Sequence, residues 1–311
     1  MAVLPQVIIV GGGFAGLAAA RRLTGVACEV TLVDRFNHHV FQPLLYQVAT
    51  AGLSPGDIAS PIRWILRKQP RLRVLLATVE HIDSTTNTIT LDGGETLRYD
   101  YLIVAAGATH SYFGHDDWAT AAPGLKTLDD ALAIRRRLLL AFEEAERETN
   151  PVYQRRLLTY VLIGGGPTGV EMAGALAEIA RQALRSEFDN VDPAIARIIL
   201  IEAGPSILPA FPDDLRRSAR KALRRLGVEV REGQAVTKVE DGAVWTGDER
   251  IEAHTILWAA GVAAAPISRD LGPNLDRAGR VVVEPDLSAP GHAGVFVAGD
   301  LASFSHQTAR C

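Results

Sequence analysis

The sequence predicts an α/β protein with two β-α-β units, each built around a parallel sheet. Short apolar strands alternate with amphipathic helices along the chain. The order strand, glycine-rich turn, helix, strand occurs twice, about 150 residues apart. Because 311 residues suffice for two domains of ordinary size, we expect one unit in each domain.

Composition narrows the class of protein. Hydrophobic residues make up 48% and charged residues 22% of the chain, as in soluble globular proteins, and the net charge of -4 gives no sign of nucleic-acid binding. Cys28 and Cys311 are the two cysteines, without CxxC or metal-ligand spacing. We therefore expect no disulfide framework, dithiol centre or metal site, and a reducing, cytoplasmic compartment.

The first β-α-β unit begins near the N-terminus. The run Val3–Ala20 is almost wholly apolar, but no basic residue precedes it and three glycines interrupt it. A strand, turn and helix therefore explain it better than a signal peptide does. The expected elements are Gln6–Val10 (strand), Phe14–Leu23 (helix), Glu29–Val33, Leu72–Ile82, Thr88–Leu91, Glu95–Leu97 and Tyr101–Ala105 (strands), with a hairpin turn at 92–94.

The second unit repeats this order after a long, charged helix, Asp129–Glu148. Its expected elements are Thr159–Ile163 (strand), Thr168–Arg185 (helix), and the strands Arg197–Ile201, Gly227–Arg231, Ala235–Val239, Ala243–Trp245 and Thr255–Ala259. The last strand, Gly294–Ala298, follows the complete second unit, so we expect it to return to the first domain. The predicted domains are 1–120, 121–280 and 281–311, with the second inserted in the first.

Two basic amphipathic segments allow two interpretations. Asp213–Leu226 has leucine and alanine on one face and six basic residues elsewhere, which is typical of a helix outside a sheet with a solvated basic face. A membrane-surface role is the alternative. Ile62–Arg73 poses the same choice, and Trp64 beside arginines there suits a lipid headgroup layer better.

The first glycine-rich turn carries the strongest signal. It follows a strand and opens a helix, as a dinucleotide-binding turn must. Gly11 permits the tight turn, Gly13 lets the backbone approach a diphosphate, and Gly16 lets helix and strand pack closely. Asp34 ends the next strand, where its carboxylate can accept hydrogen bonds from a ribose. The alternative, a glycine turn of purely structural use, does not require this acid.

The second turn has the same pattern in Gly164, Gly166 and Gly169, and Glu202 ends its second strand. The loop Glu187–Ala196 makes this crossover longer than usual. Because Glu202 would repel a 2′-phosphate and no arginine follows it closely, the turn favours NAD(H) over NADP(H). Both units are thus expected to be Rossmann-like.

Three further features fit two dinucleotides. Glu171 lies one turn into the second helix, where it can hydrogen-bond a nicotinamide carboxamide or orient a flavin, or act only as an acid at a helix start. Asp300 follows the last strand and suits the ribityl or diphosphate region of FAD. Small residues end two strands, at Ala105-Ala106-Gly107 and Ala259-Ala260-Gly261, and let a cofactor pass close to the backbone.

This order resembles the two-dinucleotide-binding-domain flavoproteins, in which an NAD domain is inserted within a discontinuous FAD domain. Within them the chain most resembles the type II NADH dehydrogenases, single-subunit NADH:quinone oxidoreductases of the respiratory chain that do not pump protons. The passages that carry the resemblance are Val7–Leu17 (VIIVGGGFAGL), Asp34–Ala51 (DRFNHHVFQPLLYQVATA), Gly164–Glu171 (GGGPTGVE) and Gly299–Thr308 (GDLASFSHQT).

The resemblance implies FAD as cofactor and NADH as substrate, with Glu171 as the catalytic residue. The implied FAD residues are Gly11, Gly13, Phe14, Ala15, Gly16, Asp34, Arg35, Val79, Gly107 and Asp300. The implied NADH residues are Gly164, Gly166, Thr168, Gly169, Glu202, Ala260 and Gly261. Gln42 and Gln47 would lie by the flavin, and Val79 would contact adenine through its backbone. Two electrons would pass from NADH through the flavin to a quinone.

The family continues with a glutamine-rich helix at the quinone site and an amphipathic membrane anchor, whereas this chain stops at Ala309-Arg310-Cys311. We therefore expect a truncated form, a fragment or one half of a split gene, with the quinone step affected. Association with the cytoplasmic face of the inner membrane and a homodimer are left open.

Other functions that share these cofactors also remain open. A ferredoxin or rubredoxin reductase uses both without cysteines. A cofactor-binding protein without quinone turnover is a second alternative. A sulfide or disulfide oxidoreductase would need redox cysteines beside the flavin, and Cys28 suits a core position better.

Overall fold

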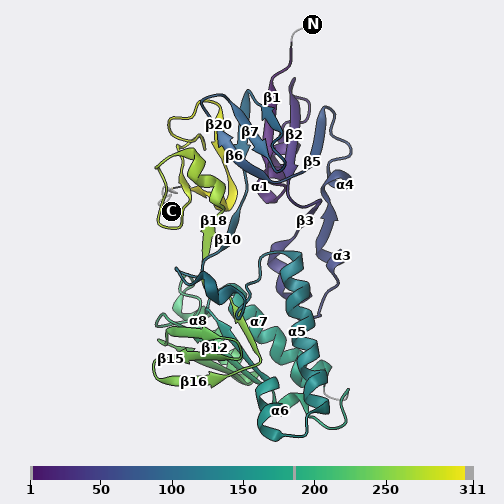
Figure 1. The fold of residues 1–311 in the computed structure, drawn as a ribbon, viewed down its shortest axis with the longest axis vertical. Coiled ribbons are helices and arrows are strands. Elements are labelled where there is room, and N and C mark those ends of the chain that lie inside the picture. Colours follow the sequence, from purple (N-terminus) through teal and green to yellow (C-terminus); the bar gives the residue numbers. More distant parts are fainter. Residues whose placement is uncertain (1–2, 185–186, 305–311) are drawn as a thin grey trace. The chain divides into compact units, whose positions relative to one another are not determined.

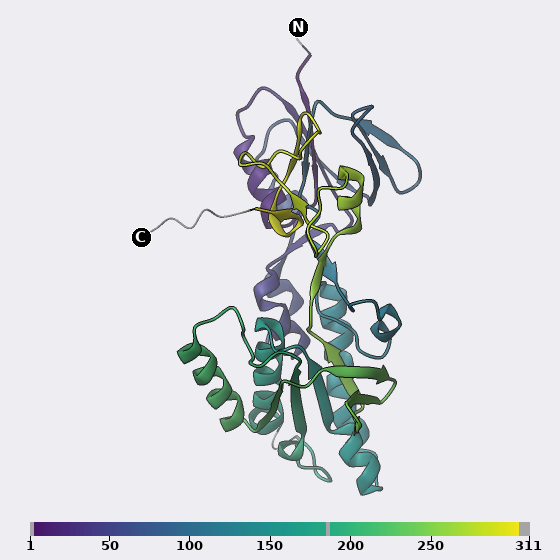
Figure 2. The same cartoon turned by 90° about the vertical axis from the view of Figure 1, so that its left-hand side faces the viewer.

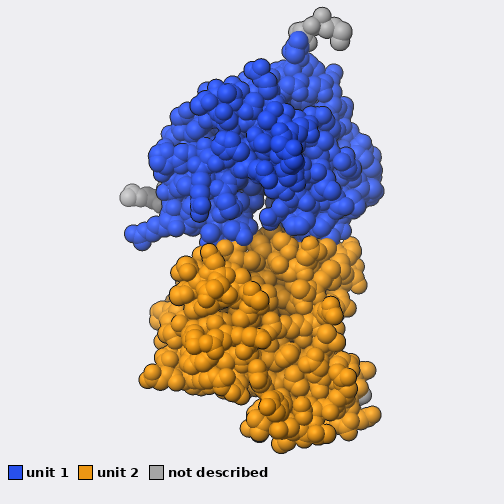
Figure 3. Space-filling view, in the orientation of Figure 1, with its two compact units in different colours: residues 1–40, 59–109, 262–311 blue, residues 41–58, 110–261 orange. Residues whose placement is uncertain are grey.

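The computed structural model describes residues 3–184 and 187–304. The chain divides into two compact units, coloured separately in Figure 3. Unit 1 comprises Met1–Val40, Ala59–Thr109 and Val262–Cys311, and unit 2 comprises Phe41–Ile58 and His110–Gly261. The domain boundaries derived from the sequence stay a prediction. By their contacts, the units change over at 109/110 and 261/262, and unit 2 also takes residues 41–58.

Unit 1 is built on a five-stranded parallel sheet in the order β20-β9-β1-β2-β5 (Figure 1). Its strands are β20 (Val295–Val297), β9 (Tyr101–Val104), β1 (Gln6–Val10), β2 (Glu29–Asp34) and β5 (Leu72–Leu76). Val295 pairs with Leu102 of β9, so the last strand of the chain joins the sheet of the first unit. The predicted return of this strand is confirmed.

Strand β1 shows why these residues form a buried central strand. Successive side chains of a strand point to opposite faces, so an unbroken apolar run is expected where both faces are covered. Val7 and Ile9 pack in a cluster with Leu17 of helix α1 (Phe14–Arg22). Ile8 and Val10 pack in a second cluster on the opposite face. The apolar β1 thus fixes the core of unit 1.

One predicted strand of unit 1 is divided in the structure, and several short elements were not predicted. The predicted strand Leu72–Ile82 is two strands, β5 and β6 (Val79–Asp83). Between them the Ala77 N–H donates a hydrogen bond to the Asp34 carbonyl. The Thr78 N–H donates to the Asp92 carboxylate, and the Asp92 N–H donates to the Thr78 carbonyl. These bonds turn the chain out of the parallel sheet. The remaining elements are β3 (His38–Val40), β4 (Ala59–Pro61), α4 (Ile62–Ile65), β7 (Thr88–Leu91), β8 (Thr96–Arg98), β10 (Ala108–His110), β18 (Val262–Ala264), η5 (Pro266–Leu271), β19 (Val281–Val282), η6 (Gly299–Leu301) and β21 (Ala302–Ser303).

Unit 2 repeats the parallel sheet with four strands in the order β13-β12-β11-β17. These are β13 (Val228–Glu232), β12 (Arg197–Glu202), β11 (Thr159–Ile163) and β17 (Thr255–Trp258). An antiparallel sheet of β14 (Val236–Glu240), β15 (Ala243–Thr246) and β16 (Glu249–Glu252) packs with one face of it, because Val161 and Ile199 share a cluster with Val244 and Ile251. Strand β16 had not been expected.

Helices complete unit 2. They are α5 (Leu128–Arg147), α7 (Pro167–Glu178) and α8 (Asp213–Arg225), with the shorter η1 (Gln42–Leu44), α2 (Leu45–Ala49), α3 (Pro55–Ile58), η2 (Asp116–Ala119), α6 (Pro151–Leu157) and η4 (Pro193–Ile195). Figure 2 shows α8 in green at its lower left, on the outside of this unit. The predicted helix Thr168–Arg185 is shorter, since α7 passes into a π-helical turn at Ile179–Ala183. Arg185 lies outside the described residues.

Local sequence explains where α5 begins. Thr127 accepts a hydrogen bond from the Asp130 N–H, and the Asp130 carboxylate accepts one from the Thr127 N–H, which makes a capping box. Such a box satisfies two backbone donors that the first helical turn leaves without partners. Within the described parts of the chain, no helix is both long and apolar enough to cross a membrane.

Candidate functional site

The first glycine-rich turn lies between β1 and α1, at the carboxyl edge of the unit 1 sheet. Gly11 has φ +103°, and a Cβ there would run into the carbonyl of Ala105. A Cβ on Gly16 would run into the carbonyl of Gly11. The Gly11 N–H donates to the Val33 carbonyl at 2.8 Å, which ties the turn to β2. Glycine is therefore required at both positions by the packing of backbone on backbone.

The second turn, between β11 and α7, repeats this arrangement. Gly164 has φ +112°, and a Cβ there would lie 2.6 Å from the backbone of Ala259. A Cβ on Gly169 would run into the carbonyl of Gly164. The Gly164 N–H donates to the Ile201 carbonyl, again at 2.8 Å. The internal repeat predicted from the sequence thus extends to individual backbone contacts.

The glycine that immediately precedes each helix is where a ligand can approach. Gly13 and Gly166 are the N-caps of α1 and α7, both with φ −71°, and neither helix start has a side-chain cap. A Cβ on either glycine would have no atom within 4 Å. The first N–H groups of a helix have no partner inside the helix and attract anions. Each turn therefore offers an open, uncapped helix start that suits a diphosphate.

In both units the acid at the end of the second strand accepts a hydrogen bond from the middle one of the three consecutive glycines, which is Gly12 in the first turn and Gly165 in the second. Asp34 accepts from the N–H groups of Gly12 at 2.5 Å and Phe36 at 2.7 Å. Glu202 accepts from the N–H groups of Gly165 and Gly204, each at 2.6 Å. A carboxylate has about four acceptor positions, so both acids keep capacity for ribose hydroxyls. The predicted acids thus lie directly against the predicted turns.

Sequence reasoning missed the donors that hold the carbonyls of the same glycines. The Gly12 carbonyl lies 3.1 Å from Nδ1 of His39, and the Gly165 carbonyl accepts from the Leu208 N–H at 2.7 Å. One donor is a side chain and the other is backbone. Neither the spacing nor the type of these residues signals the contact in the sequence.

The other residues expected at the first turn lie mostly around the same sheet edge. Arg35 stacks on Phe36 with 5.0 Å between guanidinium and ring centre. Gly107 follows β9, and Asp300 lies in η6 directly after β20. A Cβ on Gly299 would be 3.2 Å from that of Ala15, so the end of β20 approaches the start of α1. Val79 begins β6, just after the break near Asp34.

The residues expected at the second turn also gather within unit 2. Ala260 and Gly261 follow β17, whose end lies against Gly164. The ring of Phe113 covers Gly261. Thr168 is in the first turn of α7, and Glu171 follows one turn later. Glu171 is an exposed residue, and partial desolvation of its carboxyl raises its pKa.

Gln42 and Gln47 are placed in η1 and α2, and α2 packs against α5 and α7. They therefore belong to unit 2 by their contacts, and their position beside a flavin stays a prediction. Cys28 is 5% exposed and precedes β2, at the edge of the sheet opposite the turn. This fits a core residue. The other cysteine, Cys311, lies outside the described residues, as do residues 305–308 of the last family-like passage.

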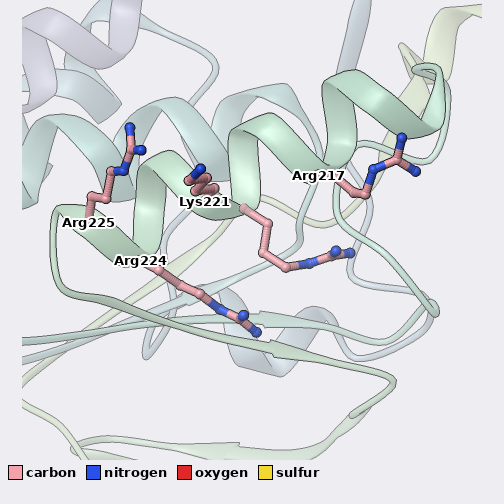
Figure 4. Close-up of a pocket in the computed structure, with 5 residues that line it drawn as sticks. Arg217, Lys221, Arg224 and Arg225 are labelled. Carbon is pink, nitrogen blue, oxygen red and sulfur yellow. The ribbon is translucent and has the colours of Figure 1, made fainter.

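Helix α8 carries a cluster of cations on its exposed face. Arg217, Lys221, Arg224 and Arg225 project from it around a surface hollow of about 400 Å³ (Figure 4). Arg220 differs, since it bonds to Glu232 at 2.7 Å and to Ser206 at 3.2 Å. In unit 1, Trp64 is 59% exposed and stacks on Arg67. Across residues 3–184 and 187–304, no cluster of metal-ligating side chains is found.

Comparison with known proteins agrees with this geometry. The family model for pyridine nucleotide-disulphide oxidoreductases matches residues 5–311. The chain is 47% identical to the type II NADH:quinone oxidoreductase Ndh of Mycobacterium tuberculosis over 310 residues, which cover 96% of this chain and 67% of the relative. It is also 47% identical to NdhA of the same organism, covering 95% of this chain and 66% of that relative.

The fold is shared with a solved structure, that of NDH2 from Plasmodium falciparum in complex with NADH. The TM-score is 0.90 at 22% identity, and the match covers 97% of this chain and 65% of that one. The chain thus spans about two thirds of the length of the relatives that it matches. From its sequence match and its paired dinucleotide turns, the chain belongs to the pyridine nucleotide-disulphide oxidoreductase family and, within it, to the type II NADH:quinone oxidoreductases.

Proposed function

We propose that this chain binds FAD at the first turn and NADH at the second, and that it oxidises NADH with a quinone as acceptor. The observation that carries the proposal is the matched pair of open turns, each with its own acid. The 47% identity to a type II NADH:quinone oxidoreductase supports the identity of the cofactors and of the acceptor. The balanced reaction is NADH, H⁺ and quinone to NAD⁺ and quinol.

The first turn fits FAD. Its diphosphate would meet the uncapped start of α1 at Gly13, Phe14 and Ala15, and Asp34 would accept from a ribose hydroxyl. Asp300, beside the start of α1, would face the same region. FAD, when bound, supplies a flavin ring that accepts hydride at N5 from nicotinamide C4 and returns two electrons to an acceptor. No acid–base triad of the protein is required for that transfer.

The second turn fits NADH. Glu202 would hold a ribose diol, and its charge would repel the 2′-phosphate of NADPH. Glu171 is proposed to hydrogen-bond the nicotinamide carboxamide. Its carboxylate oxygens can accept hydrogen bonds from the carboxamide nitrogen, and desolvation raises the pKa of this carboxyl. The protein thus contributes the relative position of the reacting groups, which is a main factor in the rate of hydride transfer.

We also propose that the protein works in the cytoplasm, as a peripheral protein at the cytoplasmic face of the inner membrane. A quinone acceptor is lipid-soluble, so its reduction takes place at a membrane. The exposed Trp64 stacked on Arg67 suits a headgroup layer, where aromatic and basic side chains are favoured.

Two alanine variants assign the cofactors to the turns. Gly13→Ala and Gly166→Ala each place a methyl group into open space, at a φ that alanine tolerates. The fold should therefore survive, while the methyl occupies the ligand's position. Gly13→Ala should lose FAD and keep NADH affinity, and Gly166→Ala should keep FAD and lose NADH affinity.

The readouts are bound flavin by absorbance, NADH affinity by titration, and anaerobic bleaching of the flavin by NADH followed by reoxidation with a short-chain quinone. The parent should bleach and reoxidise. If neither variant alters either cofactor, or if the parent binds no flavin, the proposal is wrong. Bleaching without reoxidation by quinone would restrict the function to NADH oxidation with another acceptor.

A further inference from the structure

The middle glycine of each turn is held from two sides. In the second turn the Gly165 N–H binds the Glu202 carboxylate, and its carbonyl accepts from the Leu208 N–H. In the first turn the Gly12 N–H binds the Asp34 carboxylate in the same way. The position that Leu208 fills in the second turn is filled in the first by the imidazole of His39, 3.1 Å from the Gly12 carbonyl. A side chain thus replaces a backbone donor.

The chemistry of this contact fixes the proton. A carbonyl oxygen only accepts hydrogen bonds, so Nδ1 of His39 must carry the hydrogen. The ring is also placed by its neighbours. Phe14 packs edge-on against it with 4.9 Å between ring centres, and His39 pairs with Ser60 across β3 and β4. The imidazole is therefore presented to the turn in one orientation.

The contact also orients the next peptide group. The peptide bond between Gly12 and Gly13 is planar and trans, so the Gly13 N–H points opposite to the Gly12 carbonyl. With that carbonyl directed at His39, the Gly13 N–H is directed away from it. A Cβ on Gly13 would have no atom within 4 Å, so this residue lies on the open side of the turn. Holding one end of this peptide therefore sets the direction of a donor at the ligand side of the turn.

We propose that His39 is a positioning residue for FAD, acting through the Gly12 carbonyl to fix the backbone donors of the first turn. The inference rests on the proposed binding of FAD there. A donor fixed in advance lowers the ordering entropy lost on binding. Removing one neutral hydrogen bond should weaken FAD binding about threefold to tenfold.

The test compares four single variants of the full chain by the dissociation constant for FAD, measured from flavin fluorescence. His39→Asn places an amide nitrogen at the δ position and should bind FAD within about twofold of the parent. His39→Gln moves the donor one bond outward, and His39→Ala removes it, so both should bind FAD more weakly. His38→Ala is the matched control, because the neighbouring His38 contacts Asn37 and Phe36, whereas His39 contacts the Gly12 carbonyl. It should bind FAD as the parent does.

Two further measurements separate positioning from folding. NADH affinity at the second turn should stay at the parental value in all four variants, and each variant should keep a single cooperative thermal unfolding transition. In ¹⁵N spectra of the parent imidazole, His39 should show its hydrogen on Nδ1. The inference is overturned if His39→Ala binds FAD as tightly as the parent, or if His39→Asn is as weak as His39→Ala. A parent without FAD affinity would instead overturn the proposed cofactor, and this inference with it.

Discussion

The backbone N–H of Gly165 donates a 2.6 Å hydrogen bond to the carboxylate of Glu202. The second oxygen of that carboxylate accepts from Gly204, also at 2.6 Å. Glu202 therefore connects the nucleotide turn to the loop that follows β12, in addition to any contact with a ribose. The acid that is expected to bind the ribose therefore also fixes the backbone of Gly165 and Gly204.

Replacing Glu202 should therefore affect stability and binding together. Glu202→Ala removes two charge-assisted hydrogen bonds and should lower the free energy of unfolding by about 2 kcal/mol. NADH affinity should fall about tenfold or more, and preference over NADPH should shrink. Chemical denaturation and nucleotide titration measure these effects. Glu202→Gln keeps one acceptor oxygen, so its stability and its NADH affinity should lie between those of the parent and of Glu202→Ala. An unchanged NADH affinity in Glu202→Ala would contradict the assignment.

Two glycines of α7 should respond in opposite directions to alanine. A Cβ on Gly169 would run into the Gly164 carbonyl, so Gly169→Ala should destabilise the protein by about 3 kcal/mol. A Cβ on Gly174 would have its nearest neighbours at 3.9 Å, both leucine methyls. Gly174→Ala should stabilise the helix by about 0.5–1 kcal/mol. Denaturant midpoints of the two variants check this, and equal midpoints would refute the role of close packing at Gly169.

The pH dependence of stability should contain a contribution from Glu171. Desolvation raises its folded pKa above the ordinary value of 4.5, so the folded chain holds this proton more tightly than the unfolded chain does. The stabilisation is complete below pH 4.5 and is lost as pH rises through the folded pKa. Glu171→Gln, which cannot ionise, should flatten that part of the curve.

The cations of α8 should differ in their importance for folding. Arg220 is 24% exposed and forms an ion pair with Glu232. Burial alone would raise the pKa of Glu232, but the hydrogen bonds from Arg220 and from the Ile207 N–H outweigh it and lower this pKa. Arg220→Gln should lower the unfolding free energy by about 1–2 kcal/mol. Lys221→Gln removes an adjacent exposed charge and should change it by less than about 0.5 kcal/mol. Thermal unfolding of both variants tests the difference.

Sedimentation with vesicles tests the two interpretations of the α8 surface. A variant with Arg217, Lys221, Arg224 and Arg225 all changed to Gln should remain as stable as the parent. If the basic face is only solvated, parent and variant will bind anionic vesicles equally. If it docks on a membrane, only the parent will bind them, and added salt will weaken its binding.

The parts of the site that the sequence predicted are those with local causes. Gly16 must be glycine because of the Gly11 carbonyl within the same strand–turn–helix unit, and the positive φ of Gly11 is also a property of that turn. The two acids end the strands that follow these turns. The break at Ala77 was missed because it depends on a hydrogen bond to Asp34, far back in the chain. Strand β16 was missed because its exposed, charged residues do not alternate as an amphipathic strand does.

The sequence by itself determined that the chain has two glycine-rich strand–turn–helix units, which strand each turn follows and which acid accompanies each. Only the tertiary structure decided what holds the carbonyls of Gly12 and Gly165, and that residues 41–58 pack with unit 2. The physical reason is distance along the chain. The contact of Gly16 with Gly11 acts over five residues, whereas His39 reaches Gly12 from 27 residues away, and that approach exists only once β3 and β4 have paired.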